Sequence, residues 1–192
     1  MTLKLILAFV IAFAVSAVSS GIGAFLVPFL RKIKAGQAIR EDGPRWHMSK
    51  SGTPTMGGLM FIAAIAVVCL SVGFECMAEG EYGHLFCLAF ALVFGAIGFL
   101  DDYEKLKKKQ NPGLTAGKKL LLQLAAAVAF LFLMRRFGYV ALDSLYIPFW
   151  NKTVPVSEPL YVIFAAFVIV GTVNSVNLTD GVDGLAASTT MP

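Results

Sequence analysis

Long apolar runs with almost no ionisable side chains constrain this chain more than any other feature of its sequence. Separate segments in lipid satisfy their backbone hydrogen bonds only as helices. Of the 192 residues, 57% are hydrophobic and 15% are charged, which is too apolar for soluble domains. The sequence therefore predicts an all-α, polytopic transmembrane protein and excludes a water-soluble globule. The predicted spans lie near residues 5–30, 55–73, 84–100, 118–134 and 158–176.

The two ends of the chain each pose a question. The first run follows Lys4, and Ala12-Phe13-Ala14 imitates a signal-peptide cleavage site, but the apolar sequence continues through Phe29 and favours a span. A further apolar stretch begins at Leu185 and stops at Pro192. We expect five complete spans and the start of a sixth, in a single transmembrane domain over residues 1–192.

Basic residues are distributed unequally between the two sides of the membrane. The loops after the first and third spans carry twelve Lys and Arg residues, whereas the opposite side carries four. The positive-inside rule places the twelve-residue side in the cytoplasm and the N-terminus outside. The net charge of +4 is too small to indicate nucleic-acid binding. The three cysteines indicate neither a disulfide framework nor a metal site.

Two adjacent carboxylates, Asp101 and Asp102, directly follow the third span. Carboxylates at a helix C-terminus oppose the helix dipole and are costly beside hydrocarbon. Mg²⁺ commonly takes one or two carboxylates together with substrate phosphates. The pair therefore favours a functional site over a solvated helix end.

A second polar cluster, in "NSVNLTDGVDG", follows the fifth span on the same predicted side. Its glycines permit close approach of the backbone to a ligand, and its amides and carboxylates suit a nucleobase or a ribose. The alternative is a Gly-rich turn between two spans. The polar side chains are Asn174, Asn177, Thr179, Asp180 and Asp183.

A third segment, "RWHMSKSGTPTMGG", leads into the second span. Lys50 and Thr55 are candidate donors to a phosphate or a sugar near a helix N-terminus. A basic loop attracted to anionic lipid explains the segment equally well. The third cluster is therefore informative only in combination with the other two.

Three motifs in this order and spacing resemble the phospho-N-acetylmuramoyl-pentapeptide-transferase family: "GTPTMGG", "GFLDDYEKLKKKQNPGLTAGKK" and "NSVNLTDGVDGLA". The resemblance implies about ten transmembrane helices, of which this chain is the amino-terminal half. It also implies transfer of phospho-N-acetylmuramoyl-pentapeptide from its UDP-linked form to undecaprenyl phosphate, with Mg²⁺ and release of UMP. The product is the first lipid intermediate of peptidoglycan synthesis.

The resemblance also implies where this reaction takes place. It indicates the cytoplasmic face of the bacterial plasma membrane, with the lipid bilayer and both substrates as partners, and it leaves a homodimer open as the assembly. The third aspartate of the family and its histidine-rich loop lie beyond this chain. We therefore expect the chain alone to be inactive.

The resemblance assigns roles to seven residues of this sequence. Asp101 and Asp102 match the paired catalytic aspartates, one as base or orienting group for the lipid phosphate and one as support for the metal, in an order that stays open. The substrate-pocket residues implied by the family are Lys50, Thr55, Asn177, Asp180 and Asp183.

Two other functions are compatible with parts of this pattern. A related transferase moves an N-acetylhexosamine 1-phosphate to a polyprenyl phosphate and shares the paired aspartates. A cation transporter is the alternative from another class, but it predicts carboxylates at mid-membrane, whereas these lie at one interface.

Overall fold

The computed structural model describes residues 2–32, 56–108 and 113–179. The chain forms two compact units, residues 1–119 and residues 120–192, and each is described by itself. The expectation of one transmembrane domain over the whole chain stays a prediction.

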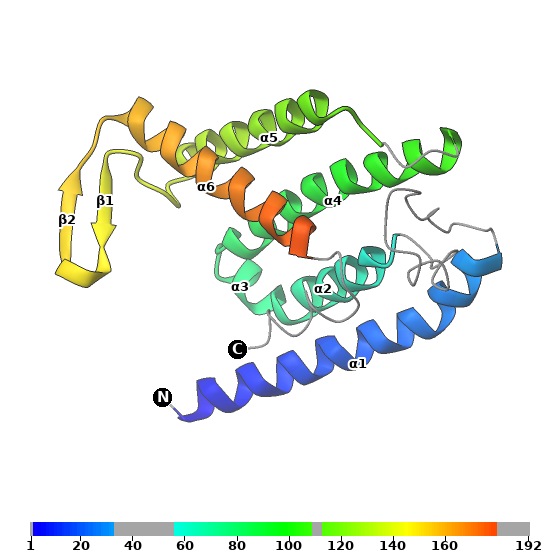
Figure 1. Cartoon of the computed structure of the whole chain (residues 1–192). Coiled ribbons are helices and arrows are strands. Elements are labelled where there is room, and N and C mark those ends of the chain that lie inside the picture. Colours follow the sequence, from blue (N-terminus) through cyan, green and yellow to red (C-terminus); the bar gives the residue numbers. More distant parts are fainter. Residues whose placement is uncertain (1, 33–55, 109–112, 180–192) are drawn as a thin grey trace. The chain divides into compact units, whose positions relative to one another are not determined.

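In its described residues, the first unit contains four complete helices (Figure 1). They are α1 (Thr2–Lys32), α2 (Gly58–Val72), the short α3 (Phe74–Ala78) and α4 (Gly83–Lys108). Helix α2 packs against both α1 and α4. Proline lacks a backbone N–H, so Pro28 removes one hydrogen bond from the last two turns of α1.

The second unit contains most of α5 (Ala116–Arg136), all of α6 (Glu158–Thr179) and a small hairpin that joins them. Strands β1 (Ser144–Ile147) and β2 (Lys152–Pro155) pair antiparallel, with Ser144 opposite Pro155 and Ile147 opposite Lys152. The 3₁₀ turn η2 (Pro148–Trp150) connects the strands. The apolar runs did not predict this hairpin.

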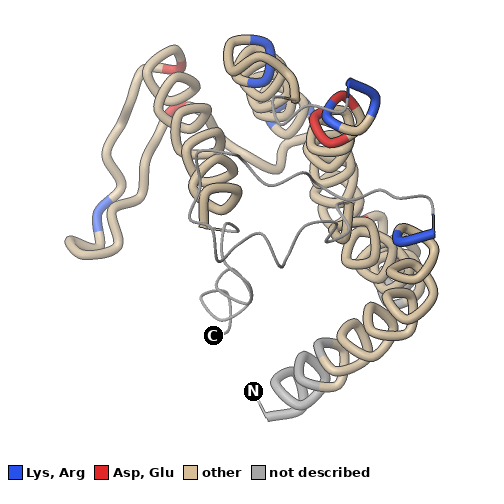
Figure 2. The backbone as a smooth tube through the Cα atoms, turned by 45° about the vertical axis from the view of Figure 1, so that its right-hand side comes forward, with Lys and Arg blue, Asp and Glu red and all other residues tan. Residues whose placement is uncertain are grey.

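The helical membrane fold is confirmed in the part of the chain that the structure describes. Four helices are long and apolar enough to cross a bilayer: Phe13–Lys32 within α1, and the whole of α4, α5 and α6. The apolar stretch of α2, Gly58–Ser71, is shorter. Figure 2 shows charged residues at the helix ends and long uncharged stretches between them. The count of five spans and the side of the N-terminus stay predictions.

Two glycines let α2 approach its neighbours closely. A Cβ atom placed on Gly95 of α4 would lie 2.6 Å from Cδ1 of Ile62, and one placed on Gly23 of α1 would lie 2.9 Å from Sδ of Met60. Side chains of α2 therefore fill the space that a larger residue would occupy. Small residues at helix contacts are the usual means of close packing in membranes, where burial from water supplies no drive between helices.

Gly95→Ala should destabilise the first unit because its new methyl group overlaps Ile62. Because the overlapped atom is the end of a flexible side chain, we expect a cost of about 1 kcal/mol, at the low end for overpacked contacts, read as a lower Tm in detergent. Gly98→Ala is the matched control, since a Cβ atom there meets nothing within 4 Å. Adding Ile62→Val removes Cδ1 and should restore much of the loss. Equal Tm values for the two alanine variants would contradict this packing.

Candidate active site

Asp101 and Asp102 directly follow the apolar part of α4, which ends at Leu100. The helix continues through them to Lys108 as a charged extension. Asp101 is buried, with 7% of its surface exposed, whereas Asp102 is half-buried. The two neighbouring carboxylates therefore have different environments.

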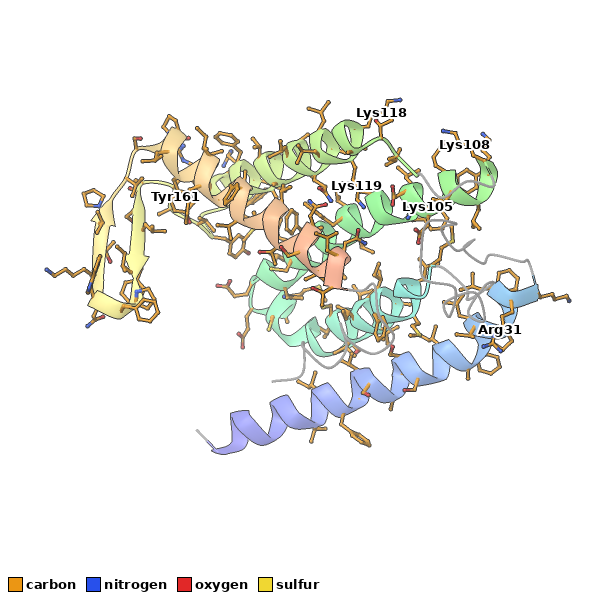
Figure 3. All side chains as sticks on the ribbon, viewed as in Figure 1. Arg31, Lys105, Lys108, Lys118, Lys119 and Tyr161 are labelled. Carbon is orange, nitrogen blue, oxygen red and sulfur yellow. The ribbon has the colours of Figure 1, made fainter. Side chains whose placement is uncertain are left out.

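Two lysines compensate the charge of this pair. Lys105 Nζ lies 2.9 Å from Asp101 Oδ2 and 3.1 Å from Asp102 Oδ1, and Lys119 Nζ lies 3.5 Å from Asp101 Oδ2. Figure 3 labels both lysines, one from α4 and one from the start of α5, whereas Lys118 points away. The site thus combines negative groups of α4 with positive groups of α4 and of the first turn of α5, all within residues 1–119.

These contacts keep Asp101 and Lys105 ionised. Burial alone would raise the pKa of Asp101, but hydrogen bonds from Lys105 and Leu114 and the charges of Lys105 and Lys119 bring it below its ordinary value. Burial would likewise lower the pKa of Lys105, and its bonds to Asp101 and Asp102 raise it instead. At neutral pH the site therefore holds the ionised carboxylate of Asp101 beside the protonated ammonium of Lys105.

The turn before α5 closes over the first carboxylate. The backbone N–H of Leu114 donates to Asp101 Oδ1 at 2.9 Å. A Cβ atom at Gly113 would lie 2.5 Å from the same oxygen and 2.6 Å from the backbone oxygen of Asp101. Only glycine fits this approach, so the Gly113–Leu114 turn fixes the orientation of the Asp101 carboxylate.

Gly113→Ala should push this turn off Asp101 and break the hydrogen bond from Leu114. Loss of that bond raises the pKa of the carboxyl, so the rate at which a hydrophobic carbodiimide modifies protonated Asp101 should increase. Peptide mass spectrometry with fragmentation distinguishes Asp101 from Asp102. Gly117→Ala is the control, because a Cβ atom there meets nothing within 4 Å. Identical labelling rates in both variants would show that the turn does not hold the carboxylate.

A second polar arrangement connects α5 and α6 in the second unit. Asn174 Nδ2 donates to Gln123 Oε1 at 2.7 Å and to the backbone oxygen of Val170 at 2.8 Å. Gln123 is fully buried. The pair lies one helical turn before Asn177, which is exposed near the end of α6. This bond fixes the register of the polar end of α6 against α5.

The bond between Gln123 and Asn174 should be measurable as a coupling energy. Gln123→Leu and Asn174→Leu should each lower stability, and the double variant should lose less than the sum. We expect a coupling of about 0.5–2 kcal/mol, the range for interhelical hydrogen bonds in membranes. Thermal unfolding of the four proteins of the cycle provides the measurement, and strictly additive losses would exclude the bond.

Four of the predicted substrate-pocket residues cannot be located relative to the Asp101–Asp102 pair. Lys50, Thr55, Asp180 and Asp183 lie outside the residues that the structure describes. Within residues 2–32, 56–108 and 113–179, no group of three His, Cys, Asp or Glu side chains is arranged to hold a metal ion. The roles of all seven residues therefore stay predictions.

Sequence reasoning missed several residues that the structure brings to these polar groups. Lys105 follows Asp101 by four positions, a spacing that places both on one helix face and was available in the sequence. Lys119, at the start of α5, also faces Asp101. No sequence signal indicated Gly113 or Gln123, because their contacts arise from the turn before α5 and from helix packing.

Comparison with known families identifies the class of protein to which this chain belongs. Residues 84–192 match the model of glycosyl transferase family 4. The chain therefore belongs to glycosyl transferase family 4. Residues 50–62 match signature 1 of the phospho-N-acetylmuramoyl-pentapeptide-transferases, which confirms the family resemblance read from the motifs.

Curated relatives agree with this assignment. The phospho-N-acetylmuramoyl-pentapeptide-transferase of Caldanaerobacter subterraneus subsp. tengcongensis is 44% identical over 185 residues, covering 96% of this chain and 54% of the relative. The enzyme of the same name from Staphylococcus carnosus is 44% identical, with 84% and 50% covered. The chain thus spans about half the length of the curated relatives it matches.

Proposed function

We propose that this chain forms part of a phospho-N-acetylmuramoyl-pentapeptide-transferase. The reaction moves phospho-N-acetylmuramoyl-pentapeptide from its UDP-linked form to undecaprenyl phosphate and releases UMP. The observation that carries the proposal is the Asp101–Asp102 pair with its two lysines at the charged end of α4, in a member of this family. The proposed location is the cytoplasmic face of a bacterial plasma membrane.

The chemistry asks for two things that this site offers. Phosphoryl transfer needs the nucleophile held in line with phosphorus and stabilisation of the charge on the transferred group. A polyprenyl phosphate presents its anionic head at the membrane surface, the depth at which α4 turns from apolar to charged. Lys105 and Lys119 would attract that phosphate, and the carboxylates that pair with these lysines would fix the position of their ammonium groups.

The different exposures of the two aspartates favour different roles. The Asp101 side chain is 10% exposed, accepts hydrogen bonds from Leu114 and Lys105 and pairs with Lys119, so an orienting role suits it better than proton abstraction. The Asp102 side chain is 28% exposed and bonds Lys105 through Oδ1. We assign contact with the substrate network to Asp102.

The donor set also fits the proposed Mg²⁺ in part. Mg²⁺ needs few protein carboxylates when substrate phosphates and waters complete its shell, and Asp102 offers one hard oxygen ligand at the surface of the site. When bound, Mg²⁺ would neutralise charge on the pyrophosphate and the departing UMP. Lys50, Thr55, Asn177, Asp180 and Asp183 are proposed to bind the nucleotide substrate.

Replacement of either aspartate in the full-length enzyme should impair turnover. Asparagine keeps the size and removes the charge, so Asp101→Asn and Asp102→Asn should each lower kcat by about 10²-fold or more. Glu104→Gln is the matched control, since Glu104 lies on the same helix and pairs with Lys108 instead. Near-normal turnover of either asparagine variant would mean that this aspartate is only a solvated charge beyond the apolar part of α4.

The identity of the donor substrate separates this proposal from its alternatives. UMP release by the full-length enzyme should require undecaprenyl phosphate and the UDP-linked muramoyl pentapeptide. Equal or faster release with a UDP-N-acetylhexosamine would favour the related sugar-1-phosphate transferase. If neither donor supports UMP release, the transferase proposal is wrong and a transport function has to be considered again.

A further inference from the structure

The hairpin between α5 and α6 displays an unusual set of exposed aromatic side chains. Phe149 is 95% exposed and Trp150 is 72% exposed at the turn, and Tyr146 on β1 is also exposed. All four residues of β2 are exposed as well. Within the second unit, the hairpin therefore does not use these side chains to build a core.

Two hydrogen bonds hold the hairpin that carries these aromatic side chains in a defined conformation. Tyr146 Oη donates to Asn151 Oδ1 at 2.8 Å, across the turn whose last residue, Asn151, has a left-handed φ of 49°. At the base, the N–H of Val156 donates to the backbone oxygen of Asp143 at 2.8 Å. Phe149 and Trp150 are thus presented by a closed hairpin at the tip of its strands.

The hairpin is tied at both ends to helices of membrane-spanning length. Helix α5 ends at Arg136 and α6 begins at Glu158, and an ion pair between Arg135 and Glu158 joins these ends. In Figure 1 the hairpin extends away from the point at which the two helices are joined. Strands of four residues reach only about 13 Å, so the hairpin cannot leave the neighbourhood of the bilayer surface.

The residue types match lipid headgroups as the surface that covers this hairpin. Aromatic residues concentrate where hydrocarbon meets water, since their rings are apolar and Trp and Tyr carry a polar group. Lys152 is the one charged residue between Ser144 and Ser157, so the segment is cationic without any carboxylate. That charge complements lipid phosphate.

We propose that the β1–β2 hairpin is a membrane-surface anchor that places Tyr146, Phe149 and Trp150 among lipid headgroups and Lys152 against lipid phosphate. The partner is the bilayer that already surrounds α5 and α6, on the side predicted to be outside. The proposal does not depend on the transferase activity.

Depth-dependent quenching in the full-length protein tests this placement. Trp46→Phe, with any tryptophan outside this chain also changed to phenylalanine, leaves Trp150 as the reporter. The protein is reconstituted in vesicles of phosphatidylcholine and phosphatidylglycerol that carry bromine either near the headgroup or near the chain end. We expect a larger loss of Trp150 fluorescence with shallow bromine than with deep bromine.

Each other outcome overturns the proposal. Quenching by aqueous acrylamide without quenching by bromine places the hairpin in water, and protection from both places a protein against it. Stronger quenching by deep bromine places the turn in hydrocarbon. If the tryptophan variant does not fold, a nitroxide on Phe149→Cys gives the same depth from its collisions with oxygen and with a water-soluble nickel complex. Vesicles with and without phosphatidylglycerol should differ in how strongly shallow bromine quenches Trp150, and Lys152→Gln should reduce that difference.

Discussion

A backbone amide in hydrocarbon has no water to bond, and this constraint determines most of what the chain can be. Helices α4, α5 and α6 meet it internally, so their side chains are free to face lipid or one another. Polar groups are then concentrated where the helices reach the membrane surface. The carboxylates of α4 lie at such an end, and the hairpin follows another.

Hydropathy predicted the helices well because the thickness of the bilayer sets the length of the apolar run that a spanning helix needs. The run at 158–176 became α6, Glu158–Thr179, with little error. The run at 84–100 marks only the apolar part of α4, which continues to Lys108 with ion pairs four residues apart. The hairpin was missed because a four-residue strand has too weak a sequence pattern to be recognised before its partner strand is known.

The candidate site likewise has a part that the sequence predicted and a part that it did not. Adjacent aspartates at a membrane interface are conspicuous in a sequence because their cost is local. The groups that hold Asp101 are not local: Leu114 is thirteen residues away, and Lys119 is on the next helix. Asn174 likewise gave no indication of Gln123, fifty-one positions earlier. Contacts of this kind follow from the fold and not from composition or spacing.

The contact between Gly95 and Ile62 has a consequence for how this family changes over evolution. Each residue occupies volume that the other leaves empty, so neither position drifts independently. A larger side chain at position 95 forces Cδ1 of Ile62 to move, and a shorter side chain at position 62 removes that demand. Selection there acts on the summed volume of two side chains from different helices, and the two alignment columns should carry a shared history.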